Sequence, residues 1–135
     1  MIALDTNVLV RYLVRDIPEQ AEAAQGLLEG LTLEDPGFIG REVTIETVWV
    51  LERPYRFSRE QIADVLEELT AVQSLIFEAR DEVAQAASRF RRGGPDFADL
   101  MILAAAERVE ASPLYTFDQT LARVPGTVLM GAPGT

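Results

Sequence analysis

The 135-residue sequence contains no cysteine, no histidine and no lysine. Without cysteine, the protein has no disulfides, zinc–thiolate sites or thiol catalysis. Without histidine, it has neither a Ser-His-Asp triad nor a histidine general base. All 12 basic residues are arginine. The absence of lysine excludes a P-loop nucleotide site. It also argues against a phospho-acceptor receiver domain, which is expected to use a lysine. Carboxylates are therefore the main source of chemistry that this composition offers.

Long apolar runs and targeting signals are also missing. No run approaches the roughly 20 apolar residues that cross a bilayer, and the N-terminus does not have the pattern of a secretory signal. These absences predict a cytoplasmic protein without membrane association, and the length predicts a single domain over residues 1–135. The net charge of −10, from 22 acidic residues, disfavours nucleic-acid binding by itself. Divalent cations in an acidic pocket would weaken that objection, because the ion is then the largest local charge.

The N-terminal stretch MIALDTNVLVRY combines an apolar run with a polar turn. A continuous apolar run at residues 2–4 predicts a short buried strand. Thr6 or Asn7 can cap a helix over residues 8–14. Asp5 then lies at the carboxyl end of a strand, where open α/β sheets bind their ligands.

The rest of the chain alternates between predicted helices and predicted strands. Apolar spacing and caps predict helices at 18–30, 41–53, 58–69, 81–92 and 100–106, the last introduced by residues 95–99, and strands at 38–39, 74–77, 113–117 and 128–130. Residues 121–124 predict a short helical turn, and residues 131–135 a frayed tail. The alternation predicts a largely parallel sheet covered by helices on both faces.

Four acidic residues share a common setting. Asp5 and Asp118 each follow a predicted strand, and Asp99 opens a very apolar helix. Glu46 interrupts the apolar side of its helix, between Ile45 and the pair Val48-Trp49. Buried carboxylates are costly unless they are paired or bind a metal, and hard oxygen ligands suit Mg²⁺ or Mn²⁺. Such an ion can activate a water toward a phosphodiester.

Simpler interpretations remain open for each acid taken alone. Asp99 and Asp118 also fit a helix cap and a turn residue. Glu46 also fits a side chain that reaches water from a buried helix. Asp96 fits a cap or a supporting group beside the site. Asp5, directly after a buried strand, favours function, and the four acids are predicted to converge on it.

Four motifs together resemble the PIN-domain ribonucleases, and more closely the VapC-type toxins of toxin–antitoxin pairs. They are IALDTNVLVRYL at the start, ETVWVL at 46–51, DFADLMI at 96–102 and TFD at 116–118. The resemblance implies a PIN-like three-layer α/β/α sandwich with a central, mainly parallel sheet. It implies a metal-dependent endoribonuclease whose Mg²⁺ or Mn²⁺ pocket is lined by Asp5, Glu46, Asp99 and Asp118. Thr6, Asn7 and Thr116 match the family's polar supporting positions.

The resemblance also implies partners, namely an RNA substrate, a second copy in a homodimer and a cognate antitoxin that docks over the catalytic groove. Without lysine, contacts to RNA phosphates or to the antitoxin are left to arginine. The candidates, each of which fits a solvated face equally well, are Arg11, Arg15, Arg89, Arg91 and Arg92. Gly40 departs from the hydroxyl or strand-like residue expected before the helix of Glu46.

Three alternatives to the toxin stay open. One is a PIN-like nuclease that processes RNA or DNA without a toxin role. Another is a catalytically silent module whose acids bind a protein partner. The third, a haloacid-dehalogenase-like phosphatase, needs a second aspartate two residues after the nucleophile, where this chain has Asn7.

Overall fold

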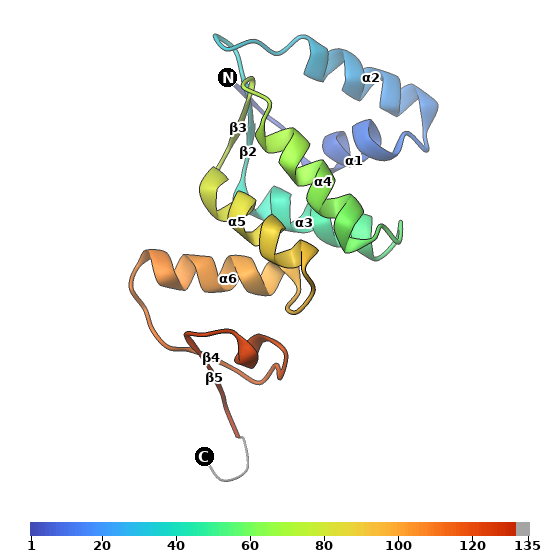
Figure 1. Cartoon of the computed structure of the whole chain (residues 1–135). Coiled ribbons are helices and arrows are strands. Elements are labelled where there is room, and N and C mark those ends of the chain that lie inside the picture. The colour runs from blue at the N-terminus through green and yellow to red at the C-terminus, as the bar shows by residue number, and fades with distance from the viewer. Residues whose placement is uncertain (132–135) are drawn as a thin grey trace.

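A computed structural model describes residues 1–131 of the chain. Most of the predicted frayed tail, residues 132–135, lies outside the described residues. The elements are β1 (Ile2–Ala3), α1 (Thr6–Val14), α2 (Pro18–Glu29), β2 (Gly37–Ile39), α3 (Arg41–Glu52), α4 (Arg59–Thr70), β3 (Leu75–Phe77), α5 (Arg80–Arg91), α6 (Phe97–Arg108), β4 (Leu114–Thr116), the 3-10 helix η1 (Leu121–Arg123) and β5 (Thr127–Leu129). This is an α/β protein, as the sequence predicts (Figure 1).

Local signals set most helix ends within a residue or two of the predicted positions. Ser58 and Gln61 form a complete capping box at the start of α4, which satisfies two backbone N–H groups that the helix leaves without partners. Pro18 begins α2, where its missing N–H costs nothing. Asp5, rather than Thr6 or Asn7, caps α1, because the helix begins at Thr6.

All described strands pair in parallel, but they form two sheets instead of the single sheet predicted. Strands β1, β2 and β3 lie side by side in that order, and β4 and β5 form a separate pair. Figure 1 shows β4 and β5 beyond α6, on the opposite side of that helix from β2 and β3. The carboxyl ends of β2 and β3 lead directly into α3 and α5.

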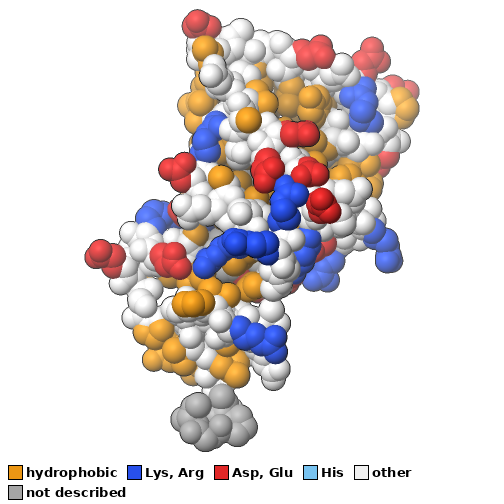
Figure 2. Space-filling view, in the orientation of Figure 1, with side chains coloured by type: hydrophobic (Ala, Val, Ile, Leu, Met, Phe, Trp, Pro, Cys, Tyr) orange, Lys and Arg blue, Asp and Glu red, His pale blue; other side chains and the backbone are white. Residues whose placement is uncertain are grey.

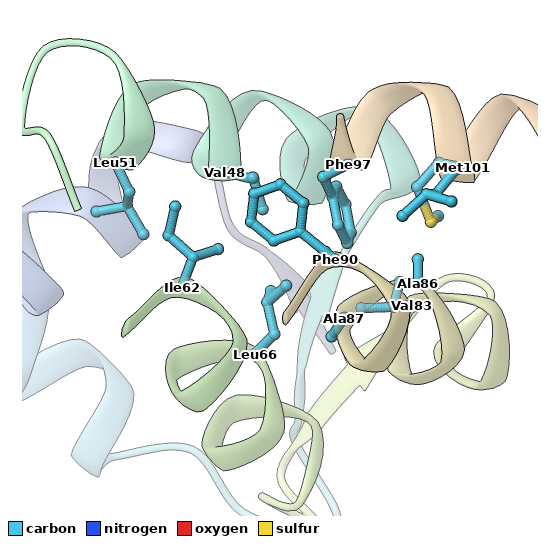
Figure 3. Packing of buried hydrophobic residues seen from close by; sticks show 11 residues of the cluster. Val48, Leu51, Ile62, Leu66, Val83, Ala86, Ala87, Phe90, Phe97 and Met101 are labelled. Atoms are coloured by element: carbon cyan, nitrogen blue, oxygen red, sulfur yellow. The ribbon is translucent and has the colours of Figure 1, made fainter. Parts of the chain in front are cut away.

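Two hydrophobic clusters hold these elements together. One joins α3, α4, α5 and α6, where Phe90 and Phe97 meet edge to face with ring centroids 6.1 Å apart (Figure 3). The other packs buried residues of the three-stranded sheet, such as Ile39 and Phe77, against α1 and α4. Ile76 points to the opposite face of the sheet from Leu75 and Phe77, and 40% of its surface is exposed. The six helices and the parallel sheet within residues 1–131 fit the predicted α/β/α sandwich.

The orientation of α3 differs from the prediction. Its buried residues are Thr44, Thr47, Val48 and Leu51, which recur at helical spacing. Trp49 lies outside this stripe and is 56% exposed, so its predicted place on the apolar side is wrong. Among residues 1–131, no helix combines the length and apolar character that crossing a membrane requires.

Candidate active site

One group of predicted site residues forms where β1 passes into α1. Asp5 has an extended backbone, and its Oδ1 accepts a hydrogen bond of 2.7 Å from the backbone N–H of Thr6. Thr6 is only 4% exposed, and its hydroxyl donates to Oε1 of Glu46. The buried threonine therefore links Asp5 on α1 to Glu46 on α3. Asn7, the next residue of α1, is exposed.

A second group forms around the start of α6. Asp99 is the third residue of α6, inside the helix and not at its cap, and it is partly buried. Burial raises the pKa of Asp99 above its ordinary value of 3.8, and the nearby charges of Asp118 and Asp96 raise it further. These carboxylates are thus close enough to repel one another, which is the condition that a bound cation relieves.

Asp118 is held in a defined turn directly after β4. Its backbone N–H donates to the hydroxyl of Thr116 at 3.0 Å, and its Oδ1 accepts from the N–H of Leu121 at 2.8 Å. The second contact starts η1, so the interpretation of Asp118 as a turn residue is correct. The side chain nevertheless stays exposed and acts on Asp99. Asp96 stands at the cap position of α6 without a side-chain cap hydrogen bond.

The four acids do not form one compact cluster. Within the described residues, no three acidic side chains come close enough to share a metal ion. The reason lies in the sheet, because carboxyl ends of parallel strands meet at one edge only when the strands belong to the same sheet. Strand β4 pairs with β5 and not with β1. Asp118, which follows β4, therefore lies near Asp99 and not at the sheet edge of Asp5.

Two arginines that sequence analysis missed hold the acid-bearing helices in place. Arg41, at the start of α3, donates from Nη2 to the carbonyl of Met101 on α6 at 2.7 Å. Its guanidinium lies 3.9 Å from Glu82 of α5, which also pairs with Arg108 at 3.0 Å. The contact between Arg41 and Met101 joins residues 60 positions apart. No local sequence pattern predicts it, since the only signal near Arg41 is the glycine that precedes α3.

Arg59 performs a similar role before α6. Its guanidinium donates to the carbonyls of Phe90, Pro95 and Gly94 at 3.2, 3.1 and 2.9 Å. It also lies 4.3 Å from the ring centroid of Phe90 and 3.8 Å from a carboxylate oxygen of Asp96. The turn that leads into Asp99 is therefore fixed by one side chain of α4.

The arginines predicted to contact RNA or an antitoxin fall into two sets. Arg11 is engaged by Gln20, Asp16 and Tyr55, and Arg91 pairs with Asp64 and Glu67. The others, all exposed, are Arg15, Arg89 and Arg92. Figure 2 shows arginine side chains gathered across the middle of one face. Arg89 and Arg92 line a surface hollow of about 340 Å³ beside Glu107.

The donor set fits a hard divalent cation in its chemistry. All four acids offer carboxylate oxygens, and burial together with the charges of Asp118 and Asp96 raises the pKa of Asp99. Mg²⁺ and Mn²⁺ prefer such ligands. A cation there would be held by Asp99 and Asp118, with Asp5 and Glu46 forming the other carboxylate group.

The structure is that of an α/β protein in which parallel strands lead into helices. Carboxylates follow two of the strands by two residues, and proteins of this class bind ligands at strand ends. The chain belongs to the PIN-domain family, because the profile of the PIN domain matches residues 2–127. The chain is also similar to the VapC ribonuclease of Aquifex aeolicus (strain VF5). The two are 26% identical over 118 residues, which is 87% of this chain and 87% of that protein.

Proposed function

We propose that the protein is a metal-dependent endoribonuclease and the toxin of a VapC-type toxin–antitoxin pair. The observation that carries the proposal is the paired arrangement of its acids in a PIN domain. Asp5 and Glu46 are joined through Thr6, and Asp99 and Asp118 lie in electrostatic contact. The similarity to a VapC ribonuclease supports RNA as the substrate.

The proposed reaction is hydrolysis of an RNA phosphodiester, which leaves a 5′-phosphate and a 3′-hydroxyl. Asp99 and Asp118 would hold Mg²⁺ or Mn²⁺ at the start of α6, and Asp5 and Glu46 would supply the second group of carboxylates. A bound divalent cation supplies Lewis acidity at the phosphodiester and lowers the pKa of a nearby water.

The protein's own side chains prepare the site in distinct ways. The Thr6 hydroxyl fixes one carboxylate oxygen of Glu46, which leaves the other oxygen to orient a water. Thr116 and the N–H of Leu121 hold Asp118 in a single turn conformation. Fixing the acidic groups before substrate arrives reduces the reorganisation needed during reaction.

Two partners follow from the proposal. The net charge of −10 complements a basic antitoxin segment that orders on binding. A homodimer in the cytoplasm completes the proposed assembly, and its mass in solution is measurable by analytical ultracentrifugation. A short neighbouring reading frame that encodes a small DNA-binding protein would support the toxin role over general RNA or DNA processing.

The first experiment is Asp5→Asn assayed on single-stranded RNA and on DNA of the same sequence, with Mg²⁺ or Mn²⁺. Asparagine also caps helices well, so the variant should keep its fold while cleavage is lost. Asp81→Asn, at an exposed first-turn position of α5, is the matched control and should cut RNA as the wild type does. Cleavage by Asp5→Asn at the wild-type rate would refute the proposed function. A wild type without activity or Mn²⁺-dependent stabilisation would favour a silent binding module.

A further inference from the structure

The only tryptophan of the chain is exposed beside the proposed active site. Trp49 lies on α3 with 56% of its surface open to solvent. It follows Glu46 by three positions, so the two side chains are neighbours on one helix face. Large helical side chains point back toward the helix N-terminus. We therefore expect the indole to lean toward the turn that carries Glu46.

Trp49 also borders the second acidic group. It lines a hollow of about 50 Å³ together with Ile45, Val48, Glu52 and Arg53, and residues 96–98 at the start of α6 line the same hollow. The hollow is too small for a nucleobase. The usable surface is consequently the exposed face of the indole, which lies on α3 one turn after Glu46 and borders the start of α6.

Trp49 has charged as well as apolar neighbours, which distinguishes it from the centre of a protein interface. Glu52, Arg53 and Asp96 border the adjoining hollow together with the apolar side chains Ile45, Val48 and Phe97, whereas the core of a protein interface is depleted of charged residues. A base has an apolar face and polar edges, and it stacks on one aromatic side chain without needing an apolar rim.

A cationic group suited to a phosphate lies next to the ring. Arg53 follows the last residue of α3 and is exposed. Within residues 1–131 its guanidinium takes part in no ion pair. An unpaired arginine beside an aromatic platform is the combination that binds single-stranded nucleic acid, since the aromatic stacks a base and the cation contacts the backbone.

We propose that Trp49 is the stacking platform for one base of single-stranded RNA, with Arg53 contacting an adjacent phosphate, so that the strand is placed beside Glu46. Trp49 is a positioning residue and does not touch the reacting atoms. This inference rests on the proposed function. It adds that the substrate is unpaired at the cleavage site, because a base within a duplex cannot stack on a side chain.

The test uses the single tryptophan as its own reporter. Full-length protein carrying Asp5→Asn is titrated with an unstructured RNA oligonucleotide, and the same strand in duplex form serves as comparison. We expect saturable quenching of tryptophan fluorescence by the single strand and little by the duplex. Adding Trp49→Ala should weaken binding of a fluorescein-labelled strand by roughly 5- to 150-fold, the range for one stacked base. Trp49→Phe should recover part of the affinity.

Tyr115→Ala is the matched control, because Tyr115 is an aromatic residue of similar exposure, 60%, on β4. It should leave RNA affinity unchanged. In the active background, Trp49→Ala should raise KM with kcat nearly unchanged, because stacking holds the strand equally before and during reaction.

Two results would overturn the inference. In the first, folded Trp49→Ala binds single-stranded RNA as tightly as its parent while the wild type still cleaves RNA, in which case the proposed function survives and the platform fails. In the second, Trp49→Ala changes only the oligomeric state in size-exclusion chromatography, which would assign Trp49 to an interface between copies. If the wild type neither binds nor cuts RNA, the proposed function and the platform both fail.

Discussion

Replacing Arg59 by methionine is expected to destabilise the protein more than any other single arginine substitution on α4 or α5. Methionine keeps much of the apolar stem but lacks the guanidinium, whose central carbon lies 4.3 Å from the ring centroid of Phe90. It removes the three hydrogen bonds to the carbonyls of Phe90, Gly94 and Pro95. The variant therefore tests the clamp on the turn before α6, separately from the packing of the side chain.

The magnitude follows from the hydrogen bonds. Bonds to charged groups contribute roughly 1.5–3 kcal/mol each. Three bonds from one guanidinium are not additive, and exposed Gly94 regains a water when the arginine is lost. We expect the free energy of unfolding to fall by about 2–4 kcal/mol, which for a domain of this size lowers Tm by roughly 10 °C.

Urea and thermal denaturation followed by circular dichroism would measure the loss. Arg91→Met is the control, because Arg91 makes two close ion pairs, 2.8 Å to Asp64 and 3.0 Å to Glu67. Ion pairs exposed to water contribute little, so Arg91→Met should cost clearly less than Arg59→Met. Equal losses, or a smaller one for Arg59→Met, would show that the carbonyl contacts do not hold the turn.

In the absence of metal, Asp99→Asn should raise the free energy of unfolding at neutral pH, because burial and the charge of Asp118 raise the pKa of Asp99 in the folded state. The folded state then binds more protons than the unfolded state, so the wild type loses stability as the pH rises from 3.8 through the raised pKa. The gain from the substitution should disappear below that interval, as urea melts in EDTA would show, and a constant difference at all pH values would contradict the reasoning. Thr6→Val should lower kcat and cost about 1–2 kcal/mol of stability, because Glu46 loses its hydroxyl donor. Thr6→Ser should restore both in rate measurements, and failure to do so would point to packing instead. Gly40→Ser should raise the free energy of unfolding by about 0.5–1.5 kcal/mol in the same melts, since α3 lacks a side-chain cap and a Cβ would approach no atom closer than 3.5 Å. A loss of stability would show that the neighbouring carboxylates repel the new side chain.

Local features were predictable from the sequence. Ser58 with Gln61 is a complete capping signal within four residues, and the structure confirms it. The strand before Asp5 was predictable because an apolar run ends immediately before that residue, and the structure has β1 at Ile2–Ala3. The order of helices and strands also followed from apolar spacing, which each segment carries in itself.

Features that depend on distant pairing were not predictable. Strands of two or three residues carry too little pattern to say which neighbours they choose, so the separation of β4 and β5 from the other strands was missed. The exposure of Trp49 depends on which stripe of α3 meets α4 and α6. The hydrogen bond from Thr6 to Glu46 joins residues 40 positions apart. The association of Asp99 with Asp118 likewise arises only when β4 returns toward α6.

The two hydrophobic clusters share Leu13 of α1 and Val65 of α4, which pack against both. Neither cluster can therefore open without disturbing the other. We expect the backbone amide hydrogens of both clusters to exchange with solvent through the same large unfolding step. Strands β4 and β5 pack mainly on each other and on η1, so their amides should exchange through a smaller opening of their own. Asp118 belongs to that less stable unit, whereas Asp5 and Glu46 belong to the more stable one. Local unfolding of β4, β5 and η1 would displace Asp118 while the rest of the protein stays folded. The stability of this C-terminal unit, and not global stability, then sets the fraction of molecules in which all four acids are in place.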